Sequence, residues 1–168
     1  DLHIGQKLLN MCRIEEHRAM LSWISSEVKT TKASVLLISG DVFDKASPSA
    51  EAQRLFFDWL AELKEIQTLK QVVITAGNHD SAAYLQAFNQ LFSYLEIHVI
   101  GADHNKDSSW IEDWVIPLRG DTGAYEGVVA AVPFLLEYRF GLKSKKVLTS
   151  DVAAEEAFRS ELKQLYTD

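Results

Sequence analysis

The sequence predicts an α/β fold in which strands and helices alternate and a second sheet follows the first. Short runs of β-branched and aliphatic residues without polar alternation recur along the chain, as expected for strands buried on both faces of a parallel sheet. Amphipathic segments of helical period separate these runs. Two of the runs end on a glycine followed by polar residues, a pattern typical of strand ends that carry a binding site.

The helices are predicted from apolar residues at helical spacing. They cover 14–28, 48–66 and about 81–95, and a last one follows a capping residue at Ser150 or Asp151. Pro48 is predicted at the first position of the second helix, where its missing N–H costs nothing. His17 has Glu15, Glu16 and Arg18 as neighbours, which indicates a solvent-facing histidine rather than a ligand.

The strands of the first sheet are predicted at 34–38, 71–75 and 97–100. Beyond them, 114–118 and 128–132 flank a glycine-rich turn and are typical of two adjacent strands. A polar loop at 102–110 separates the two groups, and no segment has linker composition. The chain is therefore expected to be a single continuous α/β domain.

The composition limits the classes of function. Seventeen Lys and Arg against 24 Asp and Glu give a net charge of −7, so the whole chain does not attract a polyanion and any nucleic-acid contact must be local. The single cysteine, Cys12, excludes an internal disulfide and a Cys-rich zinc site, which suits a cytoplasmic location or a fold without disulfides in another compartment. No apolar run reaches the roughly 20 residues of a membrane span, and a secretory signal is absent from the first residues.

Three polar segments are expected to meet at one edge of the sheet. Asp41 and Asn78 each follow a glycine at a predicted strand end, and Asp1 and His3 open the chain where an earlier strand would have ended. Carboxylates, an imidazole and an amide oxygen form a mixed shell that suits Mn, Fe or Zn. A carboxylate at a strand end can bridge two ions about 3.5–4 Å apart, and Asp41 is the candidate for this bridge.

Each segment alone is weak evidence, because Gly-Asp and Gly-Asn-His-Asp also occur as ordinary polar turns and an Asp-x-His triplet arises by chance. Together, in this order and with two of them directly after buried-type strands, they favour a metal site. Asp44 stays open between capping the next helix, orienting a ligand and lying near the substrate.

The same three segments resemble the motifs of the calcineurin-like metallophosphoesterases. D-x-H, G-D-x-x-D and G-N-H-[DE] appear here as Asp1-Leu2-His3, Gly40-Asp41-Val42-Phe43-Asp44 and Gly77-Asn78-His79-Asp80, in the family order. The sequence around these motifs, together with Val132-Pro133-Phe134-Leu135, is similar to that of SbcD-type DNA-repair exonucleases over residues 1 to about 140. The resemblance implies a sandwich of two mixed sheets flanked by helices.

The resemblance also implies roles for the residues. Asp1 and His3 would bind one divalent ion, Asn78 the second, and Asp41 both, with Mn the first candidate and Fe or Zn as alternatives. His79 would be the catalytic imidazole, which faces the scissile phosphate, stabilises the developing charge and helps to protonate the leaving oxygen. An unperturbed pKa near 6.5 makes this role feasible for a histidine.

Two ligand segments of the family pattern, a later lone histidine and Gly-His-x-His, do not occur in this chain. His98 and His104 come too early, and His104 is expected to be exposed. The chain also opens with Asp rather than Met. We therefore expect residues 1–168 to be an incomplete metallophosphoesterase domain, truncated at both ends and inactive on its own.

Three functions remain open from the sequence. The leading one is a Mn-dependent DNA nuclease subunit, with an SMC-like ATPase of the SbcC type as partner and a homodimer of the full-length protein as a further candidate. A local basic stretch could contact phosphates or be a solvated face: Arg139, Lys143, Lys145 and Lys146. The alternative is a phosphoesterase acting on small-molecule or protein-bound phosphate, which the acidic net charge favours. A metal-free binding module or structural fragment is the third.

Overall fold

The computed structural model describes residues 1–101, 114–120, 123–135 and 159–160. The chain divides into two compact units, Asp1–Phe134 and Leu135–Asp168. The predicted polar loop at 102–110, with His104, and the basic stretch at 139–146 lie outside the described residues. The predicted last helix lies outside them too, except that residues 159–160 are helical. A single domain over 1–168 stays a prediction.

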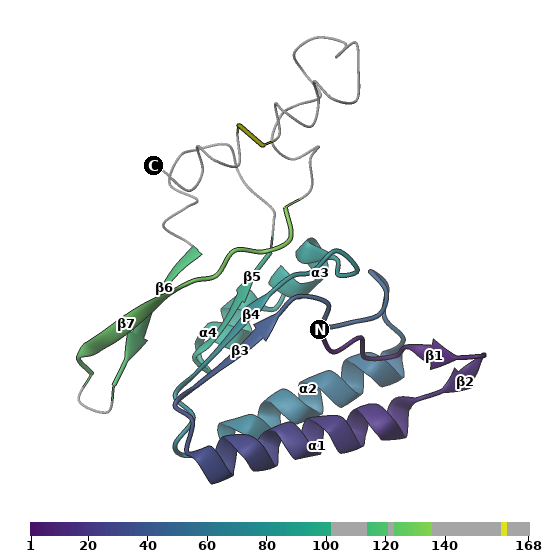
Figure 1. The fold of residues 1–168 in the computed structure, drawn as a ribbon, viewed down its shortest axis with the longest axis horizontal. Helices are drawn as coiled ribbons and strands as arrows, with labels where there is room; N and C mark the ends of the chain where they lie inside the picture. The colour runs from purple at the N-terminus through teal and green to yellow at the C-terminus, as the bar shows by residue number, and fades with distance from the viewer. Residues whose placement is uncertain (102–113, 121–122, 136–158, 161–168) are drawn as a thin grey trace. The chain divides into compact units, whose positions relative to one another are not determined.

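A parallel sheet forms the centre of the first unit. It contains β3 (Val35–Ser39), β4 (Gln71–Thr75) and β5 (Ile97–Ile100), in the order β3-β4-β5. All three strands were predicted from their apolar runs, and their positions are confirmed. The predicted burial on both faces is wrong for β3, which lies at the edge of this sheet and leaves Leu37 52% exposed. Because parallel strands point the same way, the loops after β3 and β4 leave the sheet at one edge (Figure 1).

Two long helices lie together along one face of this sheet (Figure 1). They are α1 (Ile14–Thr31) and α2 (Ala50–Lys64). The indole N–H of Trp59 donates to the hydroxyl of Ser25 over 2.9 Å, so a buried hydrogen bond joins the two helices. Helix α2 begins at Ala50, two residues later than predicted from Pro48, because the Ser49 hydroxyl accepts the Ala52 N–H and caps the helix. The prediction that Pro48 is the first helical residue is wrong.

The third predicted helix is two short ones, α3 (Ala82–Gln86) and α4 (Asn89–Ser93). The prediction of one continuous helix over 81–95 is wrong, since the chain leaves helical geometry at Phe88. The ring of Phe88 packs against the ring of Phe57 on α2, with the two ring centroids 4.9 Å apart. Apolar residues continue across the break, which explains why their spacing gives no sign of it.

A second, antiparallel sheet of two strands consists of β6 (Val115–Arg119) and β7 (Tyr125–Ala130). Ile116 of β6 packs with Val73 of β4, whereas Val72 and Ile74 belong to the core on the helix side. The β4 strand is thus buried on both faces, which is the reason for its unbroken apolar run. Parallel and antiparallel sheets with flanking helices confirm the predicted α/β fold class.

The first residues run beside the end of β3. Ile4 pairs in parallel with Phe43, and the Leu2 N–H donates to the Asp41 carbonyl over 2.8 Å. A small exposed hairpin follows, with β1 (Lys7–Leu8) and β2 (Met11–Cys12), which the sequence did not predict. Across the described parts of the chain, no helix combines the length and the apolar character that a membrane span needs.

His17 corrects one expectation from the sequence. It lies in the first turn of α1 and is only 6% exposed, so the predicted solvent-facing position is wrong. Burial lowers the pKa of His17, and the Arg13 guanidinium lowers it further, while Glu16 and Asp44 act in the opposite direction. The folded protein therefore favours the neutral imidazole.

The lowered pKa of His17 gives a stability prediction with a defined sign. In the unfolded chain this histidine titrates near 6.5, so below that pH the unfolded state binds the extra proton and is favoured. We expect the free energy of unfolding of the full-length protein, measured with urea, to fall between pH 7.5 and 5.5, and to fall less in His17→Gln. His98→Gln is a second test of the same principle, since burial also lowers the pKa of half-buried His98 and its replacement should also reduce the fall. The same decrease in wild type and His17→Gln would contradict the prediction.

Candidate metal centre

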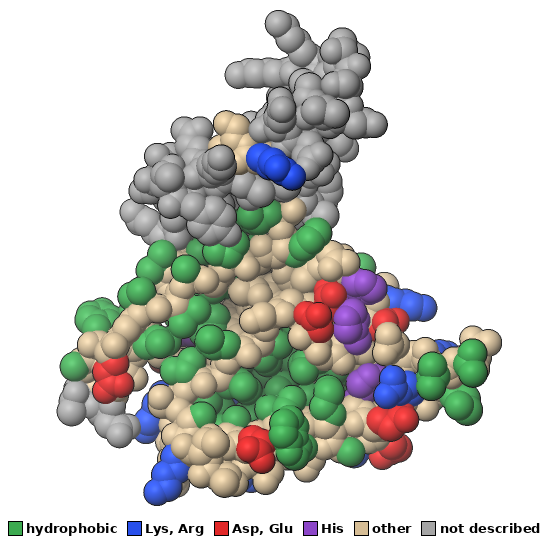
Figure 2. Space-filling model, in the orientation of Figure 1, with side chains coloured by type: hydrophobic (Ala, Val, Ile, Leu, Met, Phe, Trp, Pro, Cys, Tyr) green, Lys and Arg blue, Asp and Glu red, His purple; other side chains and the backbone are tan. Residues whose placement is uncertain are grey.

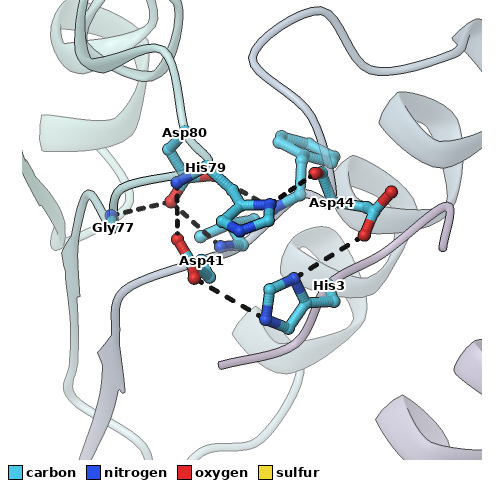
Figure 3. Close-up of polar contacts among 8 residues, drawn as sticks. His3, Asp41, Asp44, Gly77, His79 and Asp80 are labelled. Carbon is cyan, nitrogen blue, oxygen red and sulfur yellow. Dashed lines mark hydrogen bonds and ion pairs between the residues drawn. The ribbon is translucent and has the colours of Figure 1, made fainter.

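Side chains from three separate segments converge at the edge of the sheet (Figure 3). One potential ligand atom from each of Asp1, His3 and Asp41 lies within 4.8 Å of the others. His3 Nε2 is 3.6 Å from Asp41 Oδ2. Three of the four metal ligands predicted from the sequence are therefore brought together, although they are up to 40 positions apart in the chain.

Two glycines allow the loops to approach each other this closely. Gly40 has a φ of +77°, in the left-handed region that favours glycine. A Cβ on Gly77 would overlap with the backbone N and a carboxylate oxygen of Asp41. His3 and Asp41 also have left-handed backbones, with φ of +46° and +40°. The segments are thus in direct contact through their backbones.

Asn78, the fourth predicted ligand, lies in the turn after β4 and is exposed. The residues on both sides of it are fixed by hydrogen bonds. The Gly77 N–H donates to Asp80 over 2.9 Å, and the His79 N–H donates to Asp41 Oδ1 over 2.9 Å. Asn78 is therefore held in the loop adjacent to Asp41, and its role as a ligand stays a prediction.

His79 is oriented by the loop after β3. Its ring Nδ1 lies 2.8 Å from the Asp44 carbonyl oxygen, and because a carbonyl only accepts, Nδ1 donates. This hydrogen bond raises the pKa of His79, with smaller contributions from the carboxylates of Asp41, Asp44 and Asp80, against the effect of burial. The exposed ring therefore has its Nε2 available and carries a proton more readily than an ordinary histidine.

Asp44 contacts the site through both its backbone and its side chain. Its carbonyl holds His79, and its carboxylate Oδ1 is 3.8 Å from His3 Nδ1. The rings of His3 and His79 meet edge to face with centroids 5.0 Å apart. Because Ser49 caps α2, the capping alternative for Asp44 is excluded, and the geometry favours a role in orienting the two histidines.

Asp80 is a member of this site to which sequence reasoning gave no role. Its carboxylate accepts the N–H groups of Val42 and Phe43 over 3.0 Å each, in addition to that of Gly77. The only signal in the sequence was its place in the Gly-Asn-His-Asp segment, because two of its partners are 37 and 38 residues away.

The surface and chemistry of this edge fit divalent ions. Figure 2 shows histidine and acidic side chains side by side on one face of the molecule. Carboxylates with an imidazole are the donors that Mn, Fe and Zn accept. Among the described residues no hydrogen bond reaches the buried His3 Nδ1, and the Asp44 carboxylate, 3.8 Å away, is beyond hydrogen-bond distance. The donor set and this orphaned nitrogen agree with a metal-binding role for His3.

Comparisons with known proteins identify the family of the chain. Residues 1–144 match the family described as Calcineurin-like phosphoesterase. The chain is 38% identical over 136 residues to the D subunit of nuclease SbcCD from Rhodobacter capsulatus, and 32% identical over 136 residues to its counterpart from Escherichia coli K12. These alignments cover 80% of the chain but 34% and 31% of the two relatives. A "DNA double-strand break repair protein Mre11" of Methanopyrus kandleri is 39% identical over 82 residues, which cover 48% of the chain and 18% of that protein.

Proposed function

Because the chain belongs to the calcineurin-like phosphoesterase family, we propose that it supplies the N-terminal half of a two-metal site that hydrolyses phosphodiester bonds in DNA. The convergence of Asp1, His3 and Asp41 beside His79 carries this proposal. The names of the relatives, the nuclease SbcCD and the repair protein Mre11, support DNA as the substrate. The chain spans about a third of the length of its SbcCD relatives, so the remaining ligands would come from elsewhere in a full-length protein.

In this proposal Asp1 and His3 would hold one ion, Asn78 would hold the second, and Asp41 would be a ligand of both. Mn is the first candidate for both ions, with Fe and Zn as alternatives. When bound, such a pair of ions supplies Lewis-acid chemistry, activating water and offsetting charge on the attacking and leaving oxygens of the phosphate. The buried Asp41 carboxylate is suited to the shared position because it lies between the loops that carry the other ligands.

The protein's own contribution to the reaction centres on His79. The hydrogen bond from Nδ1 to the Asp44 carbonyl fixes the ring and leaves Nε2 to face a bound phosphate. A raised pKa increases the share of imidazolium, which can stabilise negative charge on the phosphate and donate a proton to the leaving oxygen. Because the Asp44 carbonyl holds the Nδ1 proton, the proton that the imidazolium can give up is the one on Nε2.

The partners proposed for the full-length protein are DNA and an SMC-like ATPase of the SbcC type, in a complex like SbcCD, with a homodimer as a further proposal. A cytoplasmic location is compatible with such a complex. The support comes from the names of the relatives, each of which the chain covers only in part.

The test compares two substrates with the full-length protein in Mn. We expect hydrolysis of linear duplex DNA, loss of activity on chelation, and a decrease in kcat of about 10²–10⁴-fold in His79→Ala with Mn binding retained, because a positioned acid contributes about that factor. A chromogenic phosphodiester is the comparison substrate, and Asp58→Ala on the exposed face of α2 is the control. Cleavage of the small ester with DNA left intact, with or without the ATPase, would favour a small-molecule or protein-bound phosphate instead.

A further inference from the structure

The Asp80 carboxylate joins the two loops that carry the predicted ligands. Its Oδ2 accepts the Gly77 N–H from its own loop and the Val42 N–H from the loop after β3, at 2.9 and 3.0 Å. Its Oδ1 accepts the Phe43 N–H at 3.0 Å. One half-buried carboxylate therefore satisfies three backbone donors from two segments (Figure 3).

The linkage is reciprocal. Asp41, on the loop after β3, accepts the His79 N–H of the other loop at 2.9 Å. Each loop thus donates backbone N–H groups to a carboxylate of the other. Hydrogen bonds to an ionised acceptor are the strong ones, and buried N–H groups without a partner are costly. The separation of Asp41 from Asn78 is therefore fixed by these contacts.

Other roles for Asp80 fit the structure less well. The cap of α3 is Ser81, whose hydroxyl accepts the Tyr84 N–H, so Asp80 is not the capping residue. Asp80 is in neither cluster of possible ligand side chains among the described residues. Its carboxylate oxygens are directed at backbone N–H groups rather than at the other ligands.

We propose that Asp80 is a positioning residue, which sets the distance between the loops bearing Asp41 and Asn78 and thereby the affinity for divalent ions. This inference rests on the proposed two-metal function. Residues that orient metal ligands typically change metal affinity or activity by about 10–100-fold when they are replaced. Asp80 should therefore influence both ions through Asp41, although it touches neither.

The chemistry of the two oxygens predicts a graded series of variants. Asp80→Ala removes all three acceptors. Asp80→Asn can place its amide oxygen at the Oδ2 position and retain the Val42 and Gly77 contacts, but its NH2 then faces the Phe43 N–H. The affinity for Mn is therefore expected to be highest in wild type, lower in Asp80→Asn and lowest in Asp80→Ala.

The experiment uses the full-length protein, with Mn as the probe. Calorimetry is expected to give a Mn affinity about 10–100-fold weaker in Asp80→Ala and less weakened in Asp80→Asn. Amide hydrogen exchange at Val42, Phe43 and Gly77 is expected to accelerate in the same order. Ser25→Ala is the matched control, because it removes a buried hydrogen bond to Trp59 between α1 and α2 without touching the loops, and its Mn affinity should not change.

The outcomes separate this inference from the function on which it rests. Wild-type Mn affinity in Asp80→Ala, or unchanged exchange at the three amides, would overturn the positioning role. A wild-type protein that binds no Mn would refute the proposed function, and the exchange data would still test the link between the loops. If Asp80→Ala does not fold, Asp80→Asn tests the inference. Its affinity for Mn must then be lower than that of wild type for the inference to stand.

Discussion

Replacing Asp41 is expected to abolish phosphoesterase activity in the full-length protein and to remove the stabilisation by Mn. The carboxylate is buried, faces His3 and accepts the His79 N–H, so it is the group best placed to contact both ions. A ligand at 100 times its Kd stabilises the folded state by about 2.7 kcal/mol, which is the increase that should disappear. Thermal unfolding with and without Mn, together with a nuclease assay, measures both effects.

Asp41→Asn is the more specific test of the charge at position 41, and Asp41→Ala is the second variant. The backbone there has a φ of +40°, which Asn tolerates better than Ala. Asn also keeps an acceptor for the His79 N–H, so Asp41→Asn removes the charge while preserving the contact between the loops. Asp58→Ala controls for the loss of an acidic side chain elsewhere. Retained Mn stabilisation in Asp41→Asn would exclude Asp41 as a shared ligand.

Gly77→Ala is expected to damage both the stability of the protein and its metal site. An added Cβ would overlap with the carboxylate and backbone N of Asp41, and its closest carbon neighbour, Asp41 Cγ, would be 2.7 Å away. The loop cannot retreat from Asp41 without breaking the hydrogen bonds of Val42 and Phe43 to Asp80 and that of His79 to Asp41. Overpacking of this kind costs about 1–3 kcal/mol. Chemical denaturation and Mn calorimetry measure the two losses.

The control for this substitution is Gly127→Ala on β7. Among the described residues, a Cβ there meets only Leu118 Cδ1 at 3.9 Å, an ordinary contact, so the free energy of unfolding should change by less than about 0.5 kcal/mol. Equal effects of the two substitutions would mean that crowding at Asp41 is not the cause. Normal Mn binding in Gly77→Ala would show that the loops can separate without loss of the site.

Much of the central sheet and its site could be predicted because the relevant signals are local. The runs of β3 and β4 are apolar on both faces, and the glycine after each marks the strand end. Because β3 and β4 pair in parallel, the loops that carry Asp41 and Asn78 must leave the sheet at the same edge. In the structure, the side chain of Asp41 lies there close to those of Asp1 and His3.

The rest depended on contacts that spacing does not reveal. Asp80 acquires its role from amides 37 and 38 residues away, which no local pattern encodes. The break between α3 and α4 is hidden because the apolar stripe continues through Phe88. For His17 the signal existed: it lies three residues after Ile14 and four before Leu21, on the buried stripe of α1, and the charged neighbours concealed it.

The left-handed backbone at His3 and Asp41 has a consequence for the evolution of this protein. Each such residue is disfavoured locally by about 1–2 kcal/mol, and the neighbouring Ile4 and Phe43, each 1% exposed, anchor the two segments in the core. Glycine at either position would relax the backbone and at the same time delete a predicted ligand. Mn at about 100 times its Kd stabilises the folded protein by more than this strain at either residue, so selection on the metal-bound protein would retain both residues, whereas relief of the strain would favour glycine only in the metal-free protein.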